Sequence, residues 1–391
     1  MQKSVVAAIR TRHPFDEGVV TFLDAFSKHI MADGRCKEHG DVITLAFWCR
    51  KASINQMREN YGWLEGRIGR GLVFHIAPGN VAVNFAYSLA AGLLSGNANI
   101  VRLPSKQFEQ VDLICGAIEA TLGKHPEIAP LIEFTRYGHD KGVTDEISAR
   151  CDVRVIWGGD DTINEIRKSP LRPRAVEIAF PDRYSILLID ADRYIAKPDK
   201  DAVARAFYND TFLSDQNACT SPKLVVWLGK GVEEAQEAFW ARIGEYAGER
   251  YELQGVQAVF KLSRMMMLAA KFSGVKCLPG GDNLINRVQI GQLSEEVFEY
   301  CGHSGFFMEY HAESIADILP VCGEKLQTLS YLGVDPSEIT EFIDENAPKG
   351  IDRIVPMGRT MDFSLVWDGY DLIYSMTRAI SLARDSIDVT L

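Results

Sequence analysis

The sequence contains no run of about twenty apolar residues, which is the length that a helix needs to cross a lipid bilayer. Its most apolar stretch, residues 73–94, is interrupted by polar residues and by a turn at Pro78 and Gly79. That pattern is typical of a strand, a loop and a helix. The first ten residues also lack the apolar core of a signal peptide. We therefore expect no membrane span and no signal peptide.

The eight cysteines include no C-x-x-C pair and are spread almost evenly along the chain. A zinc ribbon needs paired cysteines, and a chain of this length does not need a disulfide framework. We therefore expect a reducing compartment, the cytoplasm, and no bound metal.

Positive charge is also in short supply. The sequence has 42 Lys and Arg residues against 53 Asp and Glu residues, which gives a formal net charge of −11. Nucleic acids and anionic membranes attract proteins that carry a positive field. The charge balance therefore argues against both partners, and it leaves open a local basic pocket for a phosphorylated small molecule.

Apolar residues are plentiful enough for two or three folded domains, since 47% of the 391 residues are hydrophobic. Residues 1–60 carry apolar side chains at helical spacing and are expected to form amphipathic helices. From Gly71 onward, short apolar strands alternate with helices, which predicts a parallel, doubly wound sheet. The expected strands are 71–76, 99–103, 132–137 and 153–157, and the expected helices are 81–95 and 110–122.

A second α/β region is expected to begin near Tyr184, so we place the domain boundary after residue 184. Its expected strands are 184–190, 223–228 and 306–310, and its expected helices are 201–213 and 233–250.

The turn at residues 76–81 follows a predicted strand and opens a predicted helix. Free backbone N–H groups at a helix start suit an anion, and the Asn80 side chain adds an amide donor. The alternative is an ordinary turn in which Asn80 caps the helix.

A second turn, at residues 155–163, places Gly158 and Gly159 just after a predicted strand. Glycines there would let the backbone approach a bound group closely. The segment lacks the G-x-G-x-x-G dinucleotide fingerprint. The alternative is a tight turn capped by Asp160 or Asp161.

Cys219 lies in a polar loop between a predicted helix and a predicted strand. A loop cysteine among small polar neighbours can be exposed and activated as a thiolate nucleophile. The alternative is a buried packing cysteine, which is what we expect for the other seven.

Glu177 is the one carboxylate in the apolar run of residues 174–180. A buried carboxylate could act as a proton shuttle. The alternative is a glutamate at a sheet edge that pairs with Arg174 or Arg183.

Taken together, these segments fall in the order of the aldehyde dehydrogenase superfamily. The chain resembles its LuxC-type branch, the acyl-CoA reductases that make fatty aldehyde, over roughly residues 65–380. Residues 74–85 and 92–102 resemble the cofactor region of that branch, residues 157–160 its second cofactor turn, residues 215–222 its nucleophile segment, and residues 350–358 and 367–372 its C-terminal signature.

The resemblance implies an aldehyde dehydrogenase-like fold of two doubly wound α/β domains. Residues 1–184 would form a Rossmann-like NAD(P)-binding domain with a helical N-terminal segment. Residues 185–365 would form the catalytic domain. Residues 366–391 would pack back onto the chain or onto a partner subunit.

The resemblance also implies the site residues. Cys219 takes the nucleophile position, Asn80 takes the oxyanion-hole position, and Glu177 is the best match to the catalytic glutamate. The positions that correspond to cofactor contacts are Ala77, Pro78, Gly79, Arg102, Pro104, Ser105, Lys106, Gly158, Gly159 and Asp160.

The sequence departs from the superfamily pattern in two of these segments. Leu103 stands where the general family has a lysine before its Pro-Ser pair. Ile178 and Ala179 follow Glu177, where the family has a glycine pair. The family's second glutamate has no assigned match.

The implied reaction is the NADPH-dependent reduction of a fatty acyl-CoA to an aldehyde through an acyl thioester on Cys219. Arg102 and Lys106 would hold a ribose 2′-phosphate, which favours NADPH over NADH. The implied partners are the acyl-CoA substrate, an acyl-transferring or acyl-activating enzyme, and further copies of the chain in a homodimer or higher homo-oligomer.

Two other functions stay open. In an aldehyde-oxidising NAD(P) dehydrogenase, Glu177 would activate water to hydrolyse the acyl-enzyme. In a non-catalytic scaffold, the fold would bind an acyltransferase or a ligase. The polar loop around Cys219 argues against the scaffold.

Overall fold

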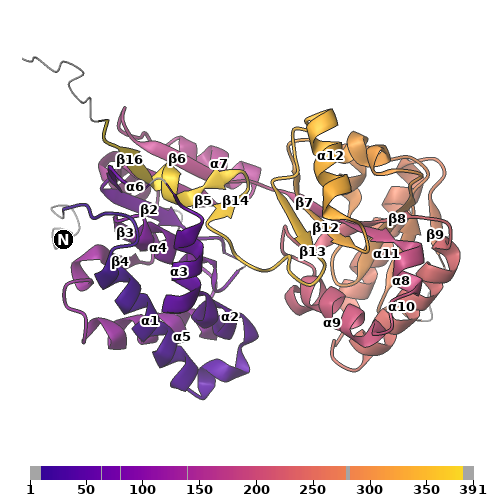
Figure 1. The fold of residues 1–391 in the computed structure, drawn as a ribbon, viewed down its shortest axis with the longest axis horizontal. Coiled ribbons are helices and arrows are strands. Elements are labelled where there is room, and N and C mark those ends of the chain that lie inside the picture. Colours follow the sequence, from indigo (N-terminus) through magenta and orange to yellow (C-terminus); the bar gives the residue numbers. More distant parts are fainter. Residues whose placement is uncertain (1–9, 63, 80, 139, 279–281, 382–391) are drawn as a thin grey trace, which may run out of the picture. The chain divides into compact units, whose positions relative to one another are not determined.

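Figure 1 shows the fold in a computed structural model, which describes residues 10–62, 64–79, 81–138, 140–278 and 282–381. Contacts between residues divide the chain into two compact units. The first unit holds Met1–Pro181 and Phe363–Leu391, and the second holds Asp182–Asp362.

The first unit begins with helices, as expected for the described residues before position 60. α1 starts where the Asp16 carboxylate accepts hydrogen bonds from the backbone N–H groups of Gly18 and Val19 at 3.0 and 3.2 Å. Its apolar face is buried in the core of this unit. The helical elements are α1 (Glu17–Ala32), the 3₁₀ turn η2 (Arg35–Glu38), α2 (Gly40–Trp48) and α3 (Lys51–Glu59).

The main sheet of the first unit has five parallel strands in the order β4-β3-β2-β5-β6, which confirms the predicted parallel sheet. The strands are β2 (Leu72–Ile76), β3 (Ala98–Arg102), β4 (Ile132–Thr135), β5 (Val153–Trp157) and β6 (Val176–Phe180). Helical segments follow them: α4 (Asn84–Leu94), α5 (Glu109–Leu122), the 3₁₀ turn η3 (Ala129–Leu131), α6 (Lys141–Arg150) and α7 (Asp160–Arg167).

The order of this sheet contains a topological switch point. From β2 the chain moves outward to β3 and β4, and it then returns to β5 on the other side of β2. Open α/β sheets bind ligands outside the carboxyl ends of the strands at such a point. Every residue of β2 and β5 is buried, as expected for central strands covered on both faces.

The C-terminal segment returns to the first unit. The residues of α13 that face the core, Leu372, Ile373 and Met376, are buried among the apolar side chains of this unit. β16 pairs antiparallel with β1 near the start of the chain. The elements are β1 (Arg67–Gly69), β14 (Val366–Trp367), β15 (Tyr370–Asp371), α13 (Leu372–Met376) and β16 (Thr377–Ala379).

The second unit has a seven-stranded sheet in the order β13-β12-β7-β8-β11-β10-β9, in which only the edge strand β9 runs antiparallel. The strands are β7 (Tyr184–Asp190), β8 (Pro222–Leu228), β9 (Lys276–Leu278), β10 (Asn286–Gln289), β11 (Phe306–His311), β12 (Leu326–Leu332) and β13 (Arg353–Pro356).

Each face of that sheet has its own apolar core, because the strand residues point alternately to opposite faces. Ile186 and Leu188 of β7 share one core with α11 and α12, and Leu187 and Ile189 share the other with α9 and α10. The helical elements are α8 (Ala191–Ile195), α9 (Lys200–Asp210), η4 (Phe212–Ser214), α10 (Val232–Gly248), α11 (Gly255–Lys271), η5 (Glu295–Tyr300), η6 (Ile315–Val321) and α12 (Pro336–Asn346).

The predicted strands 153–157 and 184–190 match β5 and β7, whereas all four predicted helices differ at their ends, two of them by three residues at one end. The helix expected from residue 81 begins at Asn84, and the helix expected to reach residue 213 ends at Asp210. A separate 3₁₀ turn, η4, follows that end. β12 and α11 lie outside the expected elements.

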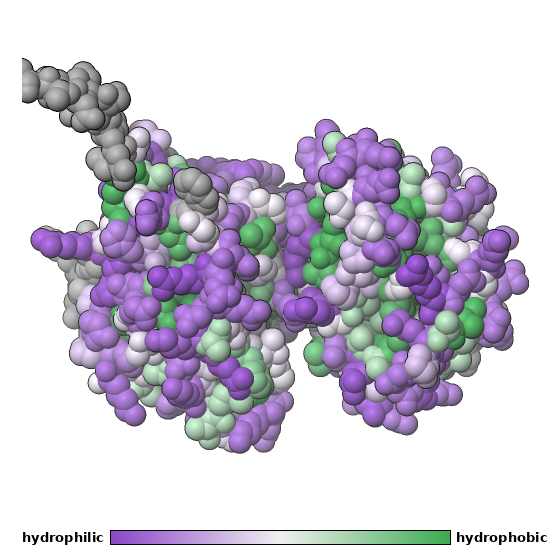
Figure 2. Space-filling view, in the orientation of Figure 1, coloured by the Kyte–Doolittle hydropathy of each residue, from purple (hydrophilic) through white to green (hydrophobic). Residues whose placement is uncertain are grey.

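The surface that Figure 2 presents is dominated by polar side chains, with the apolar ones in view scattered among them. No helix in the described part of the chain is long and apolar enough to cross a membrane.

A buried polar network crosses the core of the first unit at His75. Its Nδ1 lies 2.7 Å from Ser88 Oγ and its Nε2 lies 2.9 Å from Asn99 Oδ1. Trp157 Nε1 donates to the same Ser88 hydroxyl at 3.1 Å. Burial disfavours the charged imidazolium and lowers the pKa of His75 to about 4.

We predict that acid destabilises the protein through His75. The unfolded chain takes up this proton near pH 6.5, so stability should be complete above that pH and fall as the pH drops toward 4. The full loss should be about 3 kcal/mol. Urea unfolding of the wild type and of His75→Gln between pH 4 and 8 measures it. In His75→Gln, the free energy of unfolding should depend much less on pH. The control His29→Gln, which changes an exposed histidine, should keep the pH dependence of the wild type.

Candidate active site

The loop that carries Cys219 is held from inside by one buried amide. It begins after η4 with Asp215 and Gln216, both at a φ of 55°. The Gln216 side chain is fully buried, and its Nε2 donates to the carbonyl oxygens of Pro222 and Phe306 at 3.1 and 2.9 Å. Its Oε1 accepts the N–H groups of Gly305 and Phe306, both at 3.1 Å. The loop is therefore fixed to the start of β11.

Asp215 fixes the other side of the loop. Its carboxylate accepts the Ser304 hydroxyl at 2.7 Å and the Gln257 amide at 3.0 and 3.2 Å. The Tyr251 hydroxyl donates to the same carboxylate. Ser304 also donates its backbone N–H to the Asp215 carbonyl at 3.1 Å. A charged group with several donors has a single low-energy position.

Cys219 itself is half-buried, and its hydrogen bonds include one to each of two neighbouring strands. Its Sγ lies 3.3 Å from Gln327 Nε2 of β12, which donates to it. Its carbonyl oxygen accepts the Ser185 hydroxyl of β7 at 2.7 Å. The residue is thus partly exposed and its sulfur is oriented, which a nucleophile requires.

Lys223 brings a positive charge under the same loop. Its Nζ donates to the carbonyl oxygens of Gln216 and Gly302, the latter at 3.1 Å. Burial lowers the pKa of Lys223, while the neighbouring Cys301, Cys219 and Asp215 act in the opposite direction. No motif in the sequence pointed to Ser185, Lys223 or Gln327. A lysine or glutamine inside an apolar strand pattern is the signal that could have found the last two.

The other cysteines are only partly as expected. Four are buried, and burial raises the pKa of Cys151 and of Cys322 to about 12. Cys115 and Cys301 are half-buried. The expectation of a buried cysteine is wrong for Cys277, which is exposed because it lies on the edge strand β9.

The predicted cofactor residues of the first unit gather at one edge of its sheet. Three groups of them follow the carboxyl ends of neighbouring strands, and the Ala77 N–H donates to the Arg102 carbonyl at 3.3 Å. These groups are Ala77, Pro78 and Gly79 after β2, Arg102, Pro104, Ser105 and Lys106 at and after β3, and Gly158, Gly159 and Asp160 after β5. They flank the switch point between β2 and β5. Asn80 lies outside the described residues.

Small residues make this edge open to a ligand. A Cβ on Gly79 would meet only Ser105 Oγ, at 3.6 Å. A Cβ on Gly158 would come within 3.1 Å of Thr162, so the turn there lies close against α7. Ser105 and Lys106 are exposed beside it. The residues present therefore fit a dinucleotide, whose phosphates need backbone N–H groups and room.

The two basic residues of this edge, Arg102 and Lys106, differ in how many contacts they make with other protein groups. Arg102 donates to the Gly138 carbonyl at 2.9 Å, and its guanidinium lies 4.7 Å from the centroid of the Tyr137 ring. The ammonium of Lys106 lies 5.1 Å from the Phe108 ring centroid. Lys106 is thus the more available cation.

Glu177 lies on the edge strand β6, and its ion pairs differ from those expected. Its Oε2 accepts Arg154 Nε and Nη2 at 3.0 and 2.5 Å, and its Oε1 accepts Arg167 Nε at 2.7 Å. The expected partners are wrong: Arg183 instead pairs with Asp352 in the second unit. The Arg154 side chain is only 2% exposed, so Glu177 neutralises a buried charge.

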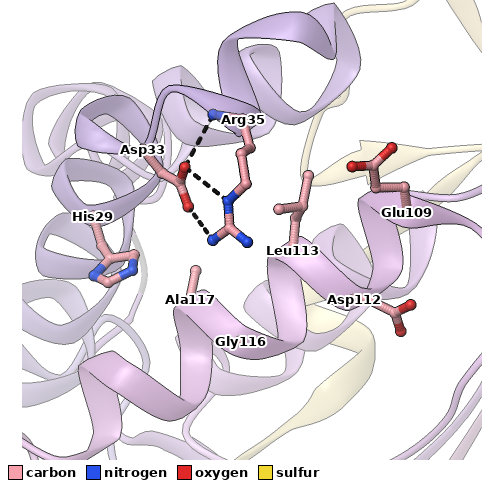
Figure 3. A pocket seen from close by; sticks show the side chains of 8 residues that line it. All are labelled: His29, Asp33, Arg35, Glu109, Asp112, Leu113, Gly116 and Ala117. Carbon is pink, nitrogen blue, oxygen red and sulfur yellow. Dashed lines mark hydrogen bonds and ion pairs between the residues drawn. The ribbon is translucent and has the colours of Figure 1, made fainter.

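Figure 3 shows a separate hollow in the first unit, between the end of α1 and α5. Asp33 and Arg35 pair on one side of it, and the acidic Glu109 and Asp112 come from α5. The hollow contains none of the predicted site residues. Among the described residues, no group of three or more His, Cys, Asp or Glu side chains is arranged to hold a metal ion.

Comparison with known sequences gives one family. A sequence model of the family described as Acyl-CoA reductase (LuxC) matches residues 4–249. Relatives include the long-chain acyl-protein thioester reductases of Vibrio harveyi, 26% identical over 298 residues, and of Photorhabdus laumondii, 25% identical over 324 residues. These alignments cover 74% and 81% of this chain but 59% and 65% of the relatives. The chain thus spans about three fifths of their length.

Comparison with solved structures gives the fold. An oxidoreductase from Marinobacter aquaeolei superposes with a TM-score of 0.69 at 12% identity, over 97% of this chain and 89% of the other. Aldehyde dehydrogenase 21 from Physcomitrella patens superposes with a TM-score of 0.65 at 13% identity, over 95% and 85%. The fold is that of the aldehyde dehydrogenases, as expected from the sequence.

We predict that Glu177 stabilises the first unit. Glu177→Gln should lower the free energy of unfolding by about 3 kcal/mol, because it leaves the Arg154 charge buried without its partner. The matched control is Arg167→Gln, which removes the exposed partner and should cost less than about 1 kcal/mol. Urea unfolding followed by circular dichroism measures both. Equal stability of Glu177→Gln and the wild type would contradict this role.

Proposed function

The chain belongs to the acyl-CoA reductase (LuxC) family, and from this premise we propose that it reduces a fatty acyl-CoA to the aldehyde with NADPH, through a thioester on Cys219. The observation that carries the proposal is the environment of Cys219. The residue is half-buried in a polar loop of fixed position, and its sulfur accepts a hydrogen bond from a buried amide. Packing cysteines have apolar neighbours instead.

In the first step, the Cys219 thiolate attacks the carbonyl carbon of the acyl-CoA thioester. A carbon–sulfur bond forms, and the carbonyl oxygen becomes an oxyanion. In this proposal the Cys219 backbone N–H and the Asn80 side-chain amide stabilise that oxyanion. The bond to the CoA sulfur then breaks, and CoA leaves as a thiolate that takes a proton from solvent.

A reductase of this family implies a nicotinamide cofactor. We assign its binding to the turns after β2, β3 and β5, where Gly79 leaves room beside the backbone and the pair Gly158 and Gly159 follows β5. Lys106 would pair with a ribose 2′-phosphate, which supports NADPH over NADH. When bound, the reduced cofactor supplies the hydride that the acyl carbon receives.

In the last step, the bond between the Cys219 sulfur and the former acyl carbon breaks. The electron pair of that bond returns to sulfur, the aldehyde leaves, and the thiolate is ready for another acyl group. The overall change consumes one acyl-CoA, one NADPH and one proton, and it yields one aldehyde, one CoA and one NADP⁺.

The aldehyde-oxidising alternative receives less support. It needs a base that activates water, and Glu177 was the candidate. Both oxygens of the Glu177 carboxylate already accept hydrogen bonds from arginine side chains. A reductase does not need this activated water.

The relatives are described as reductases of long-chain acyl-protein thioesters, which supports a long acyl chain here and makes a protein-bound thioester a second acyl donor to test. We further propose an acyl-transferring or acyl-activating enzyme as partner. The free cysteines support a cytoplasmic location.

A homodimer is supported by α11. In this helix only Lys261 and Leu268 are buried, and its exposed side carries five large apolar side chains in succession. Such a stripe on a helix marks an interaction surface. We define the α11 stripe as Val256, Val259, Leu262, Met266 and Met267.

We predict that Cys219 carries the acyl group. Incubation with a fatty acyl-CoA without reduced cofactor should leave an acyl adduct on the peptide that contains Cys219, read by mass spectrometry. NADPH should then release the aldehyde, which can be trapped. The exposed Cys277 should carry no adduct, and Cys277→Ser should reduce acyl-CoA at the wild-type rate.

Cys219→Ser should fold normally and lose reduction by at least about 10³-fold, because an alkoxyl ester accepts hydride poorly and serine is a weaker nucleophile. Substantial acyl-CoA reduction by this variant would refute the mechanism. CoA-free, aldehyde-dependent reduction of NAD⁺ in place of acyl-CoA reduction would favour the dehydrogenase alternative.

We predict that charges in the α11 stripe disrupt the dimer. Val259→Asp combined with Met266→Asp should halve the mass measured by light scattering, because each charge would be buried in the interface. Leu319→Asp changes an exposed apolar residue outside α11 and serves as the control, with an unchanged mass. A dimer that survives the double substitution would place the interface elsewhere.

A further inference from the structure

We propose that three neighbouring strands of the second unit form a support that orients Cys219 and favours its thiolate, and that Gln327 is a catalytic residue because its amide contacts the reacting sulfur. Ser185 and Lys223 are positioning residues in the same support. The inference deepens the proposed function, on which it rests for the identity of the reacting group.

The support is built where the register of the strands is irregular. β7 lies between β8 and β12 in the sheet. On one side, Ser185 pairs with Pro222 and Ile186 pairs with Leu224, so Lys223 is the extra residue of β8. The pairing with β12 contains the second irregularity.

On that side of β7, Tyr184 pairs with Leu326 and Ser185 pairs with Thr328, so Gln327 is the extra residue of β12. A register shift of this kind leaves one residue without a direct partner across the strands, and such irregularities occur frequently beside active sites. Two register shifts that flank the same residue, Ser185, therefore point to a function for this end of the sheet.

Each of the three residues contacts a different part of the Cys219 loop. Ser185 Oγ donates to the Cys219 carbonyl at 2.7 Å, Gln327 Nε2 donates to the Cys219 sulfur at 3.3 Å, and Lys223 Nζ donates to the Gln216 carbonyl. The backbone on both sides of the sulfur and the sulfur itself are thus held from one sheet end. A rigid strand end supports a reacting atom more precisely than a loop alone.

The orientation of the Gln327 amide is set by its surroundings. The side chain is fully buried, and its Oε1 lies 3.4 Å from the Thr328 hydroxyl, which donates to it. Its backbone carbonyl accepts the Asp352 N–H at 2.9 Å. The Nε2 end is therefore the one directed at Cys219.

An N–H donor at sulfur discriminates between the two protonation states. A thiol is a weak acceptor, whereas a thiolate accepts a strong, charge-assisted hydrogen bond. The ammonium of Lys223 acts in the same direction, because it interacts electrostatically with Cys219 and is held beneath the loop by the carbonyls of Gln216 and Gly302. The support therefore favours the form of Cys219 that attacks.

The same contact assists the end of the reaction. When the bond between the Cys219 sulfur and the product carbon breaks, the electron pair stays on sulfur, and sulfur leaves as a thiolate. The Gln327 amide then stabilises a leaving group instead of a nucleophile. Loss of this donor should slow both thioester formation and aldehyde release.

The test measures the thiolate directly, without acyl-CoA or cofactor. The rate of alkylation of Cys219 by iodoacetamide is followed by peptide mass spectrometry between pH 5 and 10. Gln327→Leu keeps the approximate size of the side chain but removes the hydrogen-bond donor. The midpoint of the alkylation rate against pH should rise by about one pH unit, and the rate at pH 7 should fall about tenfold. Lys223→Met should move the midpoint in the same direction.

Gln327→Glu provides a second variant of almost the same shape. Its carboxylate should repel the thiolate and move the midpoint up by more than Gln327→Leu does. The matched control is Ser330→Ala on the same strand, which removes a buried hydrogen bond to the Ile186 carbonyl and does not contact Cys219. The control should keep the wild-type midpoint.

A wild-type alkylation profile in folded Gln327→Leu or Gln327→Glu, judged by circular dichroism, overturns the inference. Shifted profiles in a protein that reduces no acyl-CoA would leave the support intact and refute the proposed function instead. A shift of equal size in Ser330→Ala would also overturn it, because the effect would then be a general loosening of β12.

Discussion

The geometry of the second unit depends on the side chain of Gln216, because it satisfies four backbone groups that would otherwise be buried without partners. Two carbonyl oxygens and two N–H groups from separate segments meet at this one amide. A buried polar group without a hydrogen-bond partner costs about 1–3 kcal/mol of stability. A shift of the loop would break several of these hydrogen bonds at once, so the loop is held in place. Cys219, three residues further along, is therefore rigid in its backbone although it lies in a loop.

A buried polar side chain with hydrogen bonds to several segments also organises the first unit. Burial keeps His75 neutral, and its contacts with Ser88 and Asn99 on neighbouring elements tie α4 and β3 to β2. That fixes the strand whose carboxyl end lies at the switch point. In both units, a buried polar side chain with all its hydrogen bonds formed fixes the position of a nearby turn. Apolar packing alone would not fix that position.

Much of the architecture follows from the sequence, because buried parallel strands are continuous apolar runs and the boundaries of β5 and β7 coincide with such runs. The polar loop of Cys219 could also be singled out as a candidate site, since a cysteine among polar residues is unusual. The contact between Gln327 and Cys219 could not be predicted, because the two residues are 108 positions apart in the sequence and meet through a register shift. Bulges are set by the pairing of three strands, and no local pattern in one strand encodes them.

Glu177 is a residue for which the sequence and the structure indicate different roles. Its place in the family order suggests a catalytic base, but the buried guanidinium of Arg154 needs a counter-charge, and Glu177 provides it. An acyl thioester is reduced only if it survives until hydride arrives, and an efficient base for water would shorten its life. In the proposed function, a carboxylate that is held in an ion pair does not activate water, so an acyl thioester on Cys219 persists until hydride arrives.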